Sequence, residues 1–165
     1  PEVQALVDQA RQAMRSGKMA PAAALYDQAL ARARELGDRK GEVDALRGRG
    51  NVHVGAGRIR EALDHYGRSL TLAREIGDGT GEADTLGNIG AVSLSTGQPQ
   101  KALEAFSQAL PIHRRNGDKS QEARVLYGIG LAHSDTGQYL TALESYIQAL
   151  SLYRQTGDRS GEADI

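Results

Sequence analysis

The chain has 165 residues, of which 39% are hydrophobic and 25% are charged, a balance typical of a folded globular protein rather than a disordered one. Its 20 basic and 21 acidic side chains leave a net charge of −1, which argues against a general binder of nucleic acid or membrane surfaces. The lack of cysteine excludes disulfides, zinc–thiolate sites and cysteine nucleophiles, and no apolar run approaches the ~18 residues that a membrane helix needs. We therefore expect a cytoplasmic protein.

Glycine and aromatic residues recur at a fixed interval of 40 residues. The glycine–aspartate pairs are Gly37-Asp38, Gly77-Asp78, Gly117-Asp118 and Gly157-Asp158. Midway between them stand Gly17, Gly57, Gly97 and Gly137, and the aromatic series is Tyr26, Tyr66, Phe106 and Tyr146. A period of this length indicates a repeat architecture.

Taken in chain order, the pattern predicts four repeats and the start of a fifth. The first repeat lacks its first four residues, and the last stops within its first helix. The predicted boundaries are 1–36, 37–76, 77–116, 117–156 and 157–165, which form a single array over residues 1–165. Because the chain starts with Pro1 and stops within a repeat, we expect it to be a fragment of a larger protein.

Each repeat is predicted to consist of two helices. Glycine supplies the left-handed residue that ends a helix, and aspartate after it is a good N-cap for the next one. Subtracting the turns leaves roughly 16 residues per helix, about 24 Å long. Apolar residues spaced by three and four support helices, and no stretch alternates as a strand does.

Small residues are expected where the two helices of a repeat touch. Gly50, Gly90 and Gly130 are each followed twelve positions later by an alanine (Ala62, Ala102 and Ala142), which we expect them to face. A mid-helix glycine costs about 0.5–1 kcal/mol relative to alanine, so three at one position imply that no Cβ fits there. Arg49 occupies an expected core position, and we expect it to reach outward or to pair with a carboxylate such as Asp84.

These positions resemble the tetratricopeptide repeat, over essentially the whole chain. In the third repeat the family pattern of large, apolar and small residues is matched by Leu86, Ile89, Gly90, Ala102, Phe106 and Ala109. The 40-residue period is similar to a subgroup that includes Leu-Gly-Asn scaffolds, kinesin light chains and bacterial regulators. The resemblance implies an all-α fold, a right-handed α-solenoid of stacked antiparallel helix pairs.

The resemblance also implies that the first helices of the repeats line a concave face that binds a peptide or protein segment. The family's ligand positions map to Asp8, Arg11, Asp44, Arg47, Asn51, Asp84, Asn88, Arg124 and Tyr127. Helical spacing supports the mapping, because Asp44, Arg47 and Asn51 are three and four residues apart and share one face. Asparagine can pair with peptide amides and arginine can bind a carboxylate through two N–H groups. The alternative is that these side chains are only solvated positions of amphipathic helices.

Other chemistries find little support in the sequence. His53 and His133 lie two repeats apart, and His65 and His113 lack a second ligand at i+4, so we predict no metal site. No Ser-His-Asp spacing, phosphate loop or His-Glu-x-x-His motif is present, so we predict neither an enzyme nor a cofactor.

The predicted function is therefore a protein-interaction module of a larger scaffold or regulator, with a protein or peptide partner and neither nucleic acid nor membrane. The alternative is a sensor or oligomerisation arm of a bacterial signal-transducing switch protein. Residues 1–76 carry a net charge of +3 and residues 77–165 a net charge of −4. One interpretation is head-to-tail self-association of copies, and the alternative is that the difference in charge belongs only to solvated faces.

Overall fold

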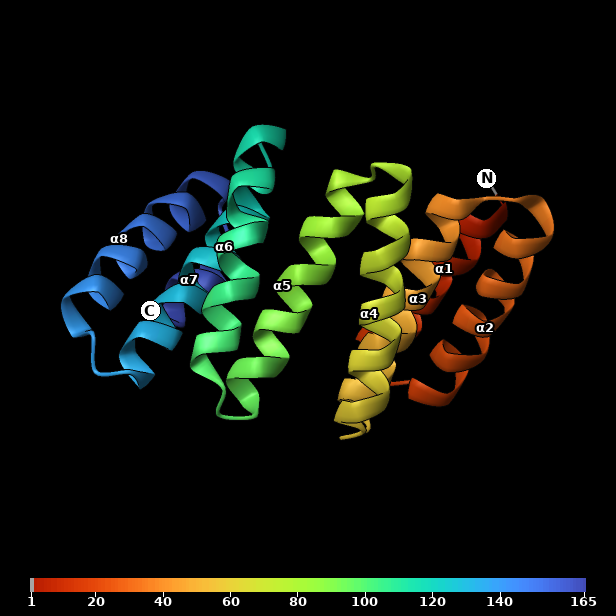
Figure 1. The fold of residues 1–165 in the computed structure, drawn as a ribbon, viewed down its shortest axis with the longest axis horizontal. Coiled ribbons are helices and arrows are strands. Elements are labelled where there is room, and N and C mark those ends of the chain that lie inside the picture. Colours follow the sequence, from red (N-terminus) through yellow and green to blue (C-terminus); the bar gives the residue numbers. More distant parts are fainter. Residues whose placement is uncertain (1) are drawn as a thin grey trace. The chain divides into compact units, whose positions relative to one another are not determined.

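The computed structural model describes residues 2–165, which form nine helices and no strand (Figure 1). The helices are α1 (Glu2–Arg15), α2 (Met19–Leu36), α3 (Arg39–Gly55), α4 (Ile59–Ile76), α5 (Gly79–Ser95), α6 (Pro99–Asn116), α7 (Lys119–Asp135), α8 (Tyr139–Thr156) and α9 (Arg159–Ala163). Consecutive helices pack against each other in antiparallel pairs, so the predicted all-α fold of stacked helix pairs is confirmed.

The joints between helices lie where the glycines predicted them. Gly77, for example, ends α4 in the left-handed conformation with φ of 69°, which costs glycine nothing because it lacks a Cβ. The aspartate after it caps α5, since the Asp78 carboxylate accepts a hydrogen bond from the Gly81 N–H at 3.1 Å. The predicted caps are present at all four glycine–aspartate joints, Asp38, Asp78, Asp118 and Asp158.

An ion pair that sequence analysis did not anticipate spans each glycine–aspartate joint. An arginine near the end of one helix bonds a glutamate in the first turn of the next, eight residues later. The N···O distances are 2.8 Å for Arg34–Glu42, 2.7 Å for Arg74–Glu82, 2.8 Å for Arg114–Glu122 and 3.4 Å for Arg154–Glu162. Each glycine–aspartate joint is thus held by a side-chain cap and an ion pair.

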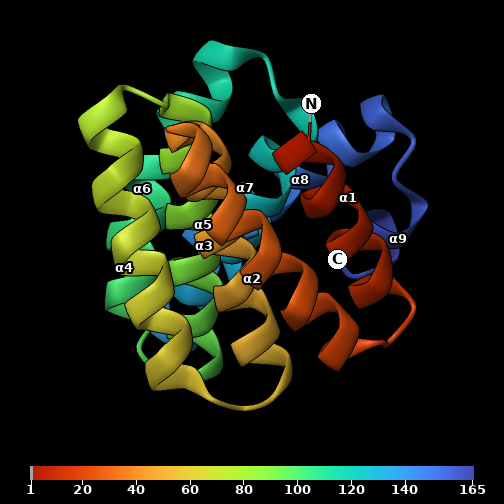
Figure 2. The same ribbon diagram turned by 90° about the vertical axis from the view of Figure 1, so that its right-hand side faces the viewer.

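The chain divides into two compact parts, an N-terminal half (residues 2–85) and a C-terminal half (Leu86–Ile165), and the division falls within α5. In the N-terminal half, α1, α2 and α3 share one core, and α1 and α2 can be followed side by side in Figure 2. Its buried members are Val3, Val7, Ala10, Ala22, Tyr26, Ala29, Ala33, Ala45 and Val52. In the C-terminal half, α7 and α8 pack around Ala123, Leu126, Ala149 and Tyr153.

Aromatic rings, rather than alanines, explain the glycines inside the first helices. A Cβ built on Gly90 would lie 2.5 Å from the Phe106 ring, and one on Gly128 would also lie 2.5 Å from that ring. Tyr66 and Tyr146 cover Gly50 and Gly130 in the same way. The prediction that no Cβ fits is confirmed, but the excluding neighbour is the aromatic residue four positions beyond the expected alanine.

Candidate functional site

Five of the predicted site residues lie together in the N-terminal half, on α1, α3 and the first turns of α5. They form an alternating row of carboxylates and guanidiniums, Asp8, Arg11, Asp44, Arg47 and Asp84. Arg11 lies 3.1 Å from Asp8 and 3.6 Å from Asp44. Arg47 bonds Asp44 at 2.6 Å and also bonds Asp84 on the next first helix. We refer to these five residues as the aspartate–arginine row.

The two ends of this row differ in their access to solvent. The side chain of Asp8 is 60% exposed, whereas at the other end those of Arg47 and Asp84 are 13% and 15% exposed. Burial alone would lower the pKa of Arg47, but the charges and hydrogen bonds of Asp84 and Asp44 outweigh it and raise the pKa. Arg47 is therefore a fixed cation between two carboxylates, and a ligand carboxylate would have to displace one of them. Arg11 and Asp8 are the accessible members of the row.

Asn51 lies on α3 beyond the aspartate–arginine row and contacts the second helix of its own repeat. Its side-chain oxygen accepts a hydrogen bond from the Tyr66 hydroxyl at 2.6 Å. Burial raises the pKa of Tyr66, which keeps the phenol protonated as a donor. Asn51 thus has a structural partner in addition to any ligand it binds.

The remaining predicted residues belong to the C-terminal half. Asn88 is half-buried on α5. On α7, the Arg124 guanidinium donates to Gln121 at 3.1 Å, and the Tyr127 hydroxyl donates to the carbonyl of Asp164 at 3.2 Å. The Tyr127 ring also lies 5.8 Å from that of Tyr146. Arg124 and Tyr127 are three residues apart along α7.

Arg49 pairs with a carboxylate, but not with the expected one. Its guanidinium lies 3.1 Å from Asp27 on α2, and Asp84 bonds Arg47 instead. The expectation of a carboxylate partner is confirmed, whereas Asp84 as that partner is wrong. The reason is the helix period, since Arg47 and Arg49 point to different sides of α3.

A histidine pair in the N-terminal half was missed by the sequence analysis. The rings of His53 on α3 and His65 on α4 stack with centroids 5.0 Å apart and planes 18° apart. Both Nδ1 atoms are buried without a hydrogen-bond partner. Burial and the charges of Arg58 and Arg49 lower the pKa of His53, and burial and the neighbouring His53 lower that of His65. In the sequence, positions expected to face each other in the two helices of a repeat are twelve residues apart, as Gly50 and Ala62 are. His53 and His65 have the same spacing, which would have predicted this pair.

These two histidines do not make a recognisable metal centre. Among residues 2–165, no three or more His, Cys, Asp or Glu side chains are grouped so that they could hold a metal ion.

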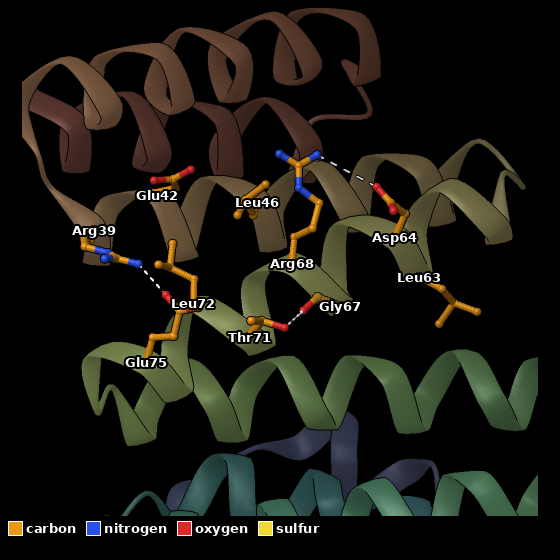
Figure 3. A pocket seen from close by; sticks show the side chains of 10 residues that line it. All are labelled: Arg39, Glu42, Leu46, Leu63, Asp64, Gly67, Arg68, Thr71, Leu72 and Glu75. Atoms are coloured by element: carbon orange, nitrogen blue, oxygen red, sulfur yellow. Dashed lines mark hydrogen bonds and ion pairs between the residues drawn. The ribbon is translucent and has the colours of Figure 1, made fainter.

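The N-terminal half also has an open pocket of about 490 Å³ between α3 and α4 (Figure 3). Its charged side chains already have partners, since Arg39 lies 2.6 Å from Glu75 and Arg68 lies 3.9 Å from Asp64. None of the predicted site residues lines it. The lining residues are Arg39, Glu42, Leu46, Leu63, Asp64, Gly67, Arg68, Thr71, Leu72 and Glu75.

Solved structures with the same fold share little sequence with this chain. BtubC (BKLC) from P. vanneervenii matches with a TM-score of 0.79 and 17% identity, over 94% of this chain and 64% of that one. The apo form of RapI matches with a TM-score of 0.74 and 16% identity, over 92% and 43%. The nearly identical TPR-like repeats assigned to a kinesin light chain of Podosopora anserina match with a TM-score of 0.62 and 13% identity, over 94% and 96%. The chain thus spans less than two thirds of the length of the first two.

No curated protein sequence matches the chain. None of the helices in residues 2–165 is both long and apolar enough to cross a membrane.

A family model described as tetratricopeptide repeat matches residues 2–75 and 77–155, which is nearly the whole chain. The two matched segments each contain two of the helix pairs described above. Proteins with this fold are protein–protein interaction modules and typically non-enzymatic scaffolds. The match and the helix pairs together establish that the chain belongs to the tetratricopeptide repeat family.

Proposed function

We propose that the first helices of the repeats form a concave surface that holds a peptide or protein segment, and that the chain is a binding module without catalytic activity. The observation that carries this proposal is the aspartate–arginine row, which gathers five polar side chains from α1, α3 and α5 on one surface. The proposed array covers residues 1–165 in the predicted repeats, and the proposed setting is cytoplasmic.

The chemistry of the row favours a ligand with a basic group. Three carboxylates face two guanidiniums, so the row carries a net charge of −1. Asp8 is its most exposed carboxylate and lies beside Arg11, so a lysine or arginine of the ligand would bind Asp8 while a backbone carbonyl accepts from Arg11. Arg47 would act by holding Asp44 and Asp84 in position.

The other proposed contacts lie on first helices of both halves, Asn51 in the N-terminal half and the rest in the C-terminal half. They are Asn51, Asn88, Arg124 and Tyr127, which offer amide, guanidinium and phenol groups to a segment's backbone.

A recovery experiment with the intact parent protein tests the proposal. Partner recovery would be compared for the natural chain and for Arg11→Ala, Asn88→Ala and Asn51→Ala, with Arg60→Ala as a control because Arg60 is exposed on α4, a second helix. We expect reduced recovery with the first three variants and unchanged recovery with the control. Thermal unfolding of each variant separates lost binding from lost folding, which matters for Asn51 because it bonds Tyr66. Equal recovery of partners with all variants would refute the proposal that this surface binds them.

A second proposal is a sensor or oligomerisation arm of a bacterial switch protein. It is favoured by one observation, that this chain matches only 43% of RapI, so repeats of this kind occur beside further chain. A nucleotide-binding motif in the parent sequence next to the repeats would favour this role over a free-standing scaffold.

A further inference from the structure

Two histidines meet between α3 and α4, close to the turn that joins these helices. The rings of His53 and His65 stack with centroids 5.0 Å apart, and His53 is only 7% exposed. The Nδ1 atoms of both rings are buried and have no hydrogen-bond partner among residues 2–165. Most buried polar atoms in folded proteins are hydrogen-bonded, so two such atoms in one contact require an explanation. We refer to His53 and His65 as the histidine pair.

The C-terminal half contains the same histidine position without a second ring. In the 40-residue register, His133 on α7 corresponds to His53, and Ser145 on α8 stands where α4 has His65. The Nδ1 atom of His133 lies 2.9 Å from the side-chain oxygen of Gln138, which can accept its N–H. A single histidine at this position therefore has a hydrogen-bond partner, and the unpartnered pair is specific to α3 and α4.

Protonation changes the chemistry of the histidine pair. A neutral imidazole has one donor and one acceptor nitrogen, whereas both nitrogens of a protonated ring are donors. Each protonated ring would thus place an N–H at a buried Nδ1, where no residue in 2–165 offers an acceptor. The stacked rings would also carry like charges 5.0 Å apart. Both effects favour separation of the rings, and the neutral rings avoid both when the hydrogen is on Nε2.

The charged side chains around the histidine pair do not offset two further positive charges. Those that act most strongly on the rings come from α2, α3, α4 and the turn between α3 and α4, and they are Asp27, Arg49, Arg58, Glu61, Asp64 and Arg68. Asp27 already pairs with Arg49 at 3.1 Å. Asp64 lies 3.9 Å from Arg68. Burial is the largest cause that lowers the pKa of both rings below the ordinary value of 6.5, and nearby positive groups add to it.

The histidine pair lies next to a contact of one residue of the proposed ligand surface. Asn51 is two residues before His53 on α3, and its side-chain oxygen accepts a hydrogen bond from the Tyr66 hydroxyl at 2.6 Å. Tyr66 directly follows His65 on α4. The two helices approach closely here, because a Cβ built on Gly50 would overlap the Tyr66 ring. A movement of α4 at His65 therefore also moves Tyr66 relative to Asn51.

We propose that the histidine pair is a pH-sensitive switch, closed while both rings are neutral and open when they are protonated. In the open state the rings lie apart in water, and the hydrogen bond from Tyr66 to Asn51 is broken. The closed state is complete above about pH 6.5 and is lost as the pH falls through the lowered pKa values of the folded rings. As a control of ligand binding through Asn51 the switch rests on the function proposed above, whereas the opening itself does not.

An NMR titration of the isotope-labelled 165-residue chain between about pH 7.5 and about pH 5 tests the switch without a ligand. Imidazole nitrogen shifts report the protonation of each ring, and nuclear Overhauser effects report whether the rings of His53 and His65 are in contact. We expect protonation to abolish this contact and to shift the side-chain amide signals of Asn51 as its bond to Tyr66 breaks.

Amide hydrogen exchange provides a second readout of the same opening. Exchange in residues 50–66, corrected for the intrinsic effect of pH, should become faster by about tenfold for each unit by which a pKa is lowered. The corresponding residues 130–146 of α7 and α8 are an internal reference, because they contain His133 but Ser145 in place of a second ring. Their exchange should show no such increase.

His65→Ser gives α4 the residue that α8 has at this position, and it should remove the pH-dependent opening. His133→Ser is the matched control, because it removes the corresponding histidine outside the pair and should leave the opening unchanged. Thermal unfolding at neutral pH shows whether each variant is folded. If His65→Ser does not fold, the titration of the natural chain decides on its own.

The proposal is overturned if the ring contact persists after both rings are protonated, or if both rings stay neutral down to about pH 5. It is also overturned if the bond between Tyr66 and Asn51 outlasts the ring contact. Exchange that accelerates equally in His65→Ser, or equally in residues 130–146, would overturn it as well. None of these measurements involves a ligand, so their failure is distinguishable from failure of the partner-recovery experiment.

Discussion

At the scale of single residues, two glycines within helices have opposite effects on the stability of the chain. Gly128 gives the Phe106 ring the room it occupies, and a Cβ there would overlap the ring. Gly67 lies in the middle of α4, and apart from the backbone of its own helix turn and its chain neighbours nothing lies within 4 Å of the place a Cβ would take. One glycine is therefore required by packing, and the other only weakens its helix.

Gly128→Ala should lower the free energy of unfolding by about 1–3 kcal/mol, because overpacking against a buried ring outweighs the gain in helix propensity. Gly67→Ala should raise it by about 0.5–1 kcal/mol, since nothing opposes the propensity gain. Chemical denaturation of both variants measures the two effects. A stabilised Gly128→Ala variant would contradict the described packing of Phe106.

The stacked His53 and His65 rings make stability depend on pH. Their pKa values lie below the ordinary value of 6.5, so the folded chain binds fewer protons than the unfolded chain under mildly acidic conditions. The full stability is present above about pH 6.5 and declines as the pH falls through the lowered values of the folded state. Acidification thus works against the α3–α4 pair.

His65→Phe should reduce this decline, because it removes one titrating ring and the repulsion between two protonated ones. Unfolding free energies at about pH 7.5 and about pH 5.5 provide the comparison with the natural chain. An undiminished decline in the variant would mean that other groups carry the pH dependence.

At the scale of helices, the first and second helices of the repeats start differently. First helices such as α3 have an aspartate cap, in this case Asp38 bonded to the Gly41 N–H at 2.9 Å. Second helices start after residues such as Lys18, Arg58, Gln98 and Gln138, whose side chains make no capping bond. Side-chain caps therefore stabilise the glycine–aspartate joints, and the joints before the second helices lack this stabilisation.

Asp38→Ala should lower the free energy of unfolding by about 1 kcal/mol through loss of the cap. Lys18→Ala, at a joint in the same half, should change it by about 0.5 kcal/mol or less. Thermal or chemical unfolding of the two variants gives the comparison, and equal effects would argue against a specific role of the cap.

The starts and ends of the helices can be predicted well from the sequence, because each is specified by residues at the joint itself. Gly77 and Asp78 specify an end and a start within two residues, and the 40-residue period repeats that information. The site was harder to predict, since Arg47 and Arg49 look alike in sequence and only the side of α3 on which each lies decides between Asp84 and Asp27. Spacing within α3 reveals one carboxylate partner of Arg47, Asp44, three residues before it, whereas the second partner, Asp84, comes from the next repeat and no spacing within one helix reveals it.

At the scale of the whole molecule, charge and shape give different expectations for self-association. The net charges of +3 on residues 1–76 and −4 on residues 77–165 attract copies head to tail. The exposed polar residues Asp8 and Gln12 on α1, however, do not complement Leu143 and Ile147, which are exposed on α8. We expect electrostatic association without a well-packed interface.

Light scattering at several ionic strengths should therefore show an average mass above that of the monomer at low salt and the monomer mass as salt is added. A monomer under every condition would refute the head-to-tail attraction. A dimer that resists salt would point instead to apolar contact.

The alternation of capped and uncapped joints also determines where a protease can first cut the folded chain. Trypsin should cleave after Lys18 and Arg58, at the turns without a side-chain cap, before it cleaves after Arg39 or Lys119, which follow capping aspartates. Early fragments should start at Met19 and Ile59, as mass spectrometry can establish. The segment that resists this digestion should consist of the second helix of one repeat and the first helix of the next. The most stable unit of the protein is therefore shifted by half a period from the repeat as defined in the sequence.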